Sequence, residues 1–260
     1  MVLLGAGRPR DALDLLEGAL AGRSRLLDPS DRDVISTLSN LALCADECGD
    51  RERSLALLRE ALQRVESLAE PPLFTHVGLL NNIGSLLHTY GRTAEALPYL
   101  ERGVAVAAQG LGPDNPAPLA LAANMAAIVR ASGDPERSAS ILLDVVERRE
   151  QILGPAAEDT LTARHGYWTS IGHCGRHEDA LSGFEELSAD VGRALGAEHQ
   201  LWAQTEISLA HCMIQAGRPA DALPHAREAE ARMEARYGHD HDRTRGARAI
   251  VERARAGAGE

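Results

Sequence analysis

The chain has 260 residues, of which 44% are apolar but only 3% are aromatic. A core built mostly from Leu, Ala and Val suits closely packed helices better than a β-sandwich. The formal net charge of −11 disfavours general affinity for nucleic-acid backbones or anionic lipid surfaces, because both need excess cationic charge on the protein.

The sequence also bears on source and compartment. All 27 basic residues are arginine, which indicates a GC-rich coding sequence such as that of an actinobacterium. No signal-peptide pattern and no apolar run of 18 residues occurs, so we expect a cytoplasmic protein. The cysteines form no C-x-x-C pair, and we interpret them as reduced thiols.

Three columns of residues repeat along the chain with a period of 42. Glycine-led segments such as GRTAEAL and GDPERSA begin at Gly7, Gly49, Gly91, Gly133, Gly175 and Gly217. A second column holds Gly112, Gly154, Gly196 and Gly238, and a third holds Pro29, Pro71, Pro113 and Pro155. Three columns in one phase indicate an internal repeat.

Taken in chain order, the pattern predicts a partial repeat over 1–27 and complete repeats over 28–69, 70–111, 112–153, 154–195 and 196–237. A capping helix is expected within 238–260, over residues 240–256. In the third complete repeat we expect one helix over 116–131 and a second over 135–152. The whole chain, 1–260, is therefore predicted to be a single all-α solenoid of antiparallel helix pairs.

Glycine and proline encode both turns of each repeat. Gly after a helix can adopt the left-handed conformation without a Cβ clash, and Pro soon afterwards suits the first turn of the next helix. A small residue stands five positions after each first-column Gly, where a close helix crossing would exclude larger side chains: Ala12, Ser54, Ala96, Ser138, Ala180 and Ala222. Each pair buries its apolar faces only when neighbours stack on it.

These residues carry a family resemblance. The spacing G-x-x-x-E-A-L from Gly91 to Leu97, with small residues seven before and five after the Gly, resembles the tetratricopeptide repeat. The 42-residue period and the L-G-P-D-N-P linker from Leu111 to Pro116 are similar to the kinesin-light-chain type. The resemblance implies a right-handed α-solenoid with a concave groove. Trp168 departs from the pattern, because a small residue is expected there, so the fifth repeat should pack differently.

An asparagine recurs nine residues before successive column glycines, at Asn40, Asn82 and Asn124. Its amide has donors and an acceptor that match the backbone of any extended peptide. By the resemblance, this position holds a bound peptide's backbone. The alternative is that each Asn bonds the backbone of a neighbouring repeat. The predicted peptide-binding residues are Asn40, Asn82, Asn124, Asn81, Ser85, His88 and Arg130.

Two histidine groups could carry other chemistry. His165, His173 and His211 are expected on the inner surface, where they could bind a metal or perform acid–base catalysis; the alternative is a solvated polar groove. His239-Asp240-His241-Asp242 has metal-ligand chemistry but occupies a linker where a side chain caps the next helix. We assign no catalytic residue, metal or cofactor.

The favoured function is a non-enzymatic scaffold that binds a peptide or partner domain in its concave groove. One alternative is a regulatory or sensor segment of a larger signalling or transcriptional regulator, and another is an enzyme using the inner-face histidines. We expect a protein or peptide partner, and neither nucleic acid nor membrane. Self-association through the incomplete N-terminal repeat, over Leu13, Leu16 and Ala19, is a further expectation.

Overall fold

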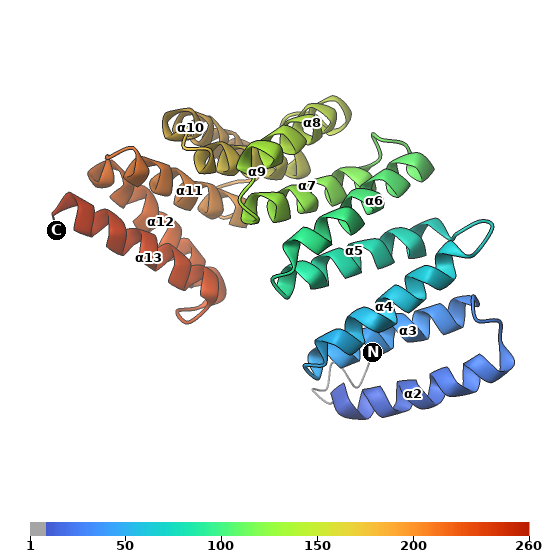
Figure 1. Ribbon diagram of the computed structural model, residues 1–260. Coiled ribbons are helices and arrows are strands. Elements are labelled where there is room, and N and C mark those ends of the chain that lie inside the picture. The colour runs from blue at the N-terminus through green and yellow to red at the C-terminus, as the bar shows by residue number, and fades with distance from the viewer. Residues whose placement is uncertain (1–8, 260) are drawn as a thin grey trace. The chain divides into compact units, whose positions relative to one another are not determined.

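The computed structural model describes residues 9–259, which form twelve helices and no strand (Figure 1). The helix pairs follow the predicted repeat. For example, α7 (Pro116–Ala131) has the predicted bounds, and α8 (Pro135–Leu153) ends one residue after the predicted end. Residues 1–8 of the predicted partial repeat lie outside the described residues. None of the described helices is long and apolar enough to cross a bilayer.

Contacts divide the chain into two compact units, which we call unit 1 (residues 1–121) and unit 2 (residues 122–260). Helix α7 spans the limit between them. Unit 1 contains α2 (Pro9–Leu26), α3 (Arg32–Glu47), α4 (Arg51–Glu66), α5 (Leu73–Thr89) and α6 (Thr93–Leu111). Unit 2 contains α8, α9 (Glu158–His173), α10 (His177–Ala194), α11 (Gln200–Gln215), α12 (Pro219–Tyr237) and α13 (Asp242–Ala258).

The turns have the predicted chemistry. Gly133, between α7 and α8, has φ 92°, and Gly154, between α8 and α9, has φ 87°, a region that residues with a Cβ rarely adopt. The Asp134 side chain then accepts a hydrogen bond from the Arg137 amide at 3.1 Å and caps α8. The local sequence thereby ends one helix and begins the next.

The column of small residues lies where helices cross closely, as predicted. All six of its members are buried, and Ala96, Ser138, Ala180 and Ala222 have no exposed surface. The Ser138 hydroxyl lies 2.7 Å from the Ala126 carbonyl oxygen of α7 and 2.9 Å from the Ser170 hydroxyl of α9. A larger side chain would have no space at these crossings.

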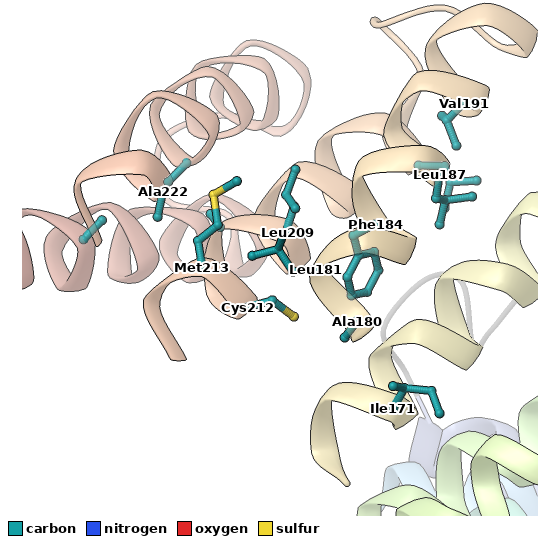
Figure 2. Close-up of a cluster of buried hydrophobic side chains, with 14 of the residues drawn as sticks. Ile171, Ala180, Leu181, Phe184, Leu187, Val191, Leu209, Cys212, Met213 and Ala222 are labelled. Atoms are coloured by element: carbon teal, nitrogen blue, oxygen red, sulfur yellow. The ribbon is translucent and has the colours of Figure 1, made fainter. Parts of the chain in front are cut away.

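Each unit has its own apolar core. The core of unit 1 includes Leu38, Leu58 and Leu80, from α3, α4 and α5. The core of unit 2 is centred on α10 and α11, where Phe184 and Leu209 are almost completely buried (Figure 2). Burying one such side chain contributes about 1.5–3 kcal/mol, so aliphatic stacking holds the helix pairs together.

Candidate functional site

The predicted peptide-binding residues of unit 1 lie on the solvent side of α3 and α5. Asn40, Asn81 and Asn82 are half-buried. They lie next to the buried residues through which α3 and α5 pack into the core. Within the described residues, none of the three side-chain amides has a hydrogen-bond partner. Among residues 9–259, no bond therefore runs from these amides to the backbone of a neighbouring repeat, the alternative that the sequence left open for Asn40, Asn82 and Asn124.

Ser85 and His88 lie on the same side of α5 as these asparagines. Both are half-buried, and the Ser85 carbonyl oxygen accepts a hydrogen bond from the Thr89 hydroxyl at 3.0 Å. The His88 Nδ1 atom lies 3.1 Å from the Thr93 hydroxyl at the start of α6. His88 thus has one ring nitrogen already engaged, while the asparagines keep their full hydrogen-bonding capacity.

The other two predicted residues, Asn124 and Arg130, belong to unit 2. Asn124 is exposed on α7. Arg130 is half-buried, its Nε atom is buried with no hydrogen-bond partner within the described residues, and burial lowers the pKa of the guanidinium. The structure therefore groups five of the seven predicted residues in unit 1 and two in unit 2.

Unit 2 contains a cavity of about 500 Å³, which we call the α11 cavity. Its wall, formed by described residues of α9, α10, α11 and α13, carries apolar, hydroxyl, thiol, amide and imidazole groups but no carboxylate. The lining residues are Thr169, Gly172, His173, His177, Phe184, Ile207, Ser208, His211, Cys212, Gln215 and Ile250.

We call the side of unit 1 that carries Asn40, Asn81 and Asn82 the asparagine face. The α11 cavity occupies the corresponding repeat positions in unit 2. Ser208 and Ile250 stand 126 and 168 residues after Asn82, which are whole multiples of the 42-residue period. Thr169 and His211 stand at the corresponding positions of Ser85. The same side of the repeat is therefore a row of amides in unit 1 and a lined hollow in unit 2.

Two of the three predicted inner-face histidines line this cavity. The His173 Nδ1 atom donates to the Thr169 carbonyl oxygen at 2.8 Å, because that oxygen can only accept. The His211 Nδ1 atom lies 3.4 Å from a guanidinium nitrogen of Arg253 and is the acceptor in that contact. Burial, followed by the charges of Arg253, His173 and His177, lowers the pKa of His211, which is consequently neutral at pH 7.

His165, the third predicted histidine, is not part of the cavity wall. Its ring meets the Phe184 ring edge-on with centroids 5.5 Å apart, and burial lowers its pKa to about 4. The imidazole that joins His173 and His211 is instead His177, at the start of α10. The sequence signal for it was a histidine in a column that elsewhere holds Pro9, Arg51, Thr93, Pro135 and Pro219.

The His165 Nε2 atom lies 3.1 Å from the Ser208 hydroxyl. A serine nucleophile needs a histidine base at such a distance. A base with a pKa near 4 accepts a proton poorly at neutral pH, however. Ser208 also lies inside α11, where backbone amides bond within the helix and are not available for an oxyanion hole. This arrangement does not favour hydrolytic chemistry.

Metal chemistry fits the histidines no better. Among residues 9–259, no group of three or more His, Cys, Asp or Glu side chains is placed to hold a metal ion. In the 239–242 segment, the His241 Nδ1 atom accepts from the Arg243 amide at 3.2 Å and caps α13, which confirms the capping interpretation. All four cysteines are free, with Cys44 and Cys212 buried.

Comparison with known proteins identifies the repeat. The family model described as "Tetratricopeptide repeat" matches residues 1–67 and 77–151, more than half of the chain. No curated protein sequence matches the chain.

Several solved structures share the fold. A Podosopora anserina protein of nearly identical kinesin-light-chain TPR-like repeats has a TM-score of 0.65 at 20% identity, covering 81% of this chain and 98% of its own. BtubC (BKLC) from P. vanneervenii has a TM-score of 0.61 at 18% identity, covering 94% and 91%. YrrB, described as a TPR protein with an unusual peptide-binding site, has a TM-score of 0.50 at 17% identity, covering 90% and 97%. The protein belongs to the tetratricopeptide repeat family, and its fold is similar to those of the solved kinesin-light-chain-like repeat structures.

Proposed function

We propose that the protein is a non-enzymatic scaffold that binds an extended segment of a partner protein on the asparagine face of unit 1. Tetratricopeptide repeats form a protein-interaction fold, and each repeat adds to an extended binding surface. The observation that carries the proposal is the set of half-buried amides of Asn40, Asn81 and Asn82, which have no hydrogen-bond partner in the described part of the chain. A half-buried amide gains most from a partner that brings both a donor and an acceptor.

The partner's backbone supplies these groups. An extended peptide presents alternating N–H and C=O groups whatever its sequence, and each amide of the face can bond one of each. Ser85 and His88 flank the asparagines on α5 and add a hydroxyl and an imidazole. In unit 2, we assign the same kind of backbone contact to Asn124. To Arg130, whose Nε atom has no partner among the described residues, we assign a contact with a carboxylate.

The test uses an array of peptides that tile the proteins of the host, from which one binding peptide is selected for titration. Asn82→Ala should weaken its binding by about 5- to 150-fold, because removing one hydrogen-bonded amide typically costs about 1–3 kcal/mol. Gln63→Ala removes an exposed amide from α4, on another helix, and is the matched control. Methylating the peptide's backbone nitrogens should weaken binding as well.

Thermal melts of both variants separate binding from folding. Asn82→Ala should melt like the parent chain, because its side chain makes no hydrogen bond within the described residues. If Asn82→Ala and Gln63→Ala bind equally well, or if backbone methylation has no effect, the partner is not held through its backbone on this face.

A further inference from the structure

The α11 cavity differs from the asparagine face in charge as well as in shape. Its lining, as far as the described residues form it, has no carboxylate although the chain carries a net charge of −11. Arg253, whose guanidinium contacts His211, has no carboxylate within ion-pair distance among the described residues. Arg248, five residues earlier on α13, pairs with Glu230 at 2.9 Å. The cavity edge thus carries a cation that no carboxylate among residues 9–259 neutralises.

The apolar part of the wall lies beside this cation. Phe184 of α10, Ile207 of α11 and Ile250 of α13 line the cavity, and Ile250 stands one helical turn before Arg253. Residues three apart on a helix share a face. An apolar contact at Ile250 and a charged contact at Arg253 are therefore available to two adjacent groups of one ligand.

The volume suits one large side chain and part of the chain that carries it. Cavities of about 300–1,000 Å³ hold compact ligands, and this one, at about 500 Å³, lies in that range. Its repeat positions correspond to those of the asparagine face in unit 1, for which we propose a peptide ligand, and this correspondence favours a chain segment here as well.

We propose that the α11 cavity is a docking pocket for a segment of a partner protein in which a bulky apolar side chain is followed by Asp or Glu. The apolar side chain lies against Phe184, Ile207 and Ile250, and the carboxylate pairs with the Arg253 guanidinium. His211 orients that guanidinium through its Nδ1 atom. The neutral state of His211 keeps this nitrogen free to accept the hydrogen bond.

The test compares two fluorescein-labelled hexapeptides by anisotropy, Gly-Ser-Leu-Glu-Ser-Gly and its amide counterpart Gly-Ser-Leu-Gln-Ser-Gly. Both carry blocked termini, so that the only carboxylate is the side chain. A matching set replaces Leu by Ile, Met or Phe, and Glu/Gln by Asp/Asn. The full chain should bind the best acidic peptide about tenfold more tightly than its amide counterpart.

Arg253→Gln should abolish this difference, whereas Arg255→Gln, an exposed arginine two residues along α13, should preserve it. Arg253→Lys keeps the charge and should keep part of the preference, which controls for a folding defect. Ile250→Gln should weaken both peptides equally. Asn82→Ala should not change the preference, so failure here is distinguishable from failure of the unit 1 site.

Several results would overturn the proposal. They are equal binding of acidic and amide peptides, equal losses in Arg253→Gln and Arg255→Gln, or no binding of any hexapeptide in the set. If 4-methylpentanoate alone binds as tightly as the best acidic peptide, the cavity takes a small organic acid and the proposed protein segment is wrong.

Discussion

Trp168 and Gly183 exchange large and small side chains relative to the other complete repeats. The position of Trp168 holds a small residue elsewhere, namely Ala42, Gly84, Ala126 or Ala210, and the position of Gly183 holds a larger one, namely Leu57, Tyr99, Ile141 or His225. A Cβ atom on Gly183 would lie 2.1 Å from the Trp168 ring. The indole therefore occupies space that a side chain on α10 fills in other repeats, which confirms that the fifth repeat packs differently.

The exchange predicts strong coupling between the two positions. Gly183→Ile should destabilise the chain by about 1–3 kcal/mol through overpacking, and Trp168→Ala by about 3 kcal/mol through loss of the half-buried ring. The double variant restores the arrangement of the other repeats, with a small residue at position 168 and a larger one at position 183. Its loss of stability should therefore be at least about 1 kcal/mol smaller than the sum of the two single losses. Urea denaturation of all four chains measures this coupling. Additive effects would show that the two sites do not share one space.

Of these two residues, only Trp168 was predicted from the sequence. Trp168 was visible as a large residue in a small column, whereas Gly183 lies 15 residues later, in a column with no strict size. Likewise, His173 and His211 were predicted to share a surface, but His177 was not, because it comes from the following helix. A repeat register aligns residues within a column, but contacts between columns depend on how the helices cross.

At the scale of elements, a buried carboxylate joins three helices of unit 2. Glu206 of α11 is buried, accepts a hydrogen bond from the Ser188 hydroxyl of α10, and lies 2.6 Å from the His225 Nδ1 atom of α12. The hydrogen bond that His225 donates to Glu206 raises the pKa of His225, with further contributions from the charges of Glu206, Glu185 and Glu228. A buried charge is costly unless it is paired, so this ion pair helps to fix the packing of α12 on α11.

The raised pKa predicts how stability depends on pH. The ion pair of His225 with Glu206 adds to the free energy of unfolding. This stabilisation is fully present below the unfolded-state pKa of His225, about 6.5, and is lost as pH rises through the higher folded-state pKa. His225→Gln should therefore destabilise the chain at pH 6 by about 1–3 kcal/mol, and by less at pH 9. Thermal melts of both chains across this range give the difference at each pH. A difference that stays constant, or grows toward pH 9, would contradict the assignment.

The elements themselves were largely predictable, because their signals are local. Gly and Pro columns placed the helix ends within one or two residues, as α7 and α8 show, and the terminal helix expected over 240–256 is observed at Asp242–Ala258. The Glu206–His225 pair was not predicted. The two residues are 19 apart and carry no shared motif, and a glutamate inside a helix is normally a solvated residue.

At the scale of the whole chain, the 42-residue period predicted the helix pairs. No residue of the repeat columns predicted the boundary between unit 1 and unit 2 near residue 121. The single solenoid over 1–260 therefore stays a prediction. Self-association through the first partial repeat also stays a prediction; in that region Leu13 and Leu16 are half-buried and Ala19 is exposed. The physical reason for repetition is that each helix pair buries its apolar faces against the neighbouring pairs.

Separate cores predict separate responses to core damage. Leu80→Ala in unit 1 and Leu209→Ala in unit 2 each truncate a buried leucine and should cost about 2–5 kcal/mol. In repeat proteins stability is a sum of repeat and nearest-neighbour terms, so the loss should spread mainly to adjacent helices. Hydrogen exchange read by mass spectrometry should show Leu80→Ala exposing α3 to α6 more than α10 to α12, and Leu209→Ala the reverse. If both variants accelerate exchange evenly over all described helices, the chain unfolds as one cooperative body, and the two units are not thermodynamically separate.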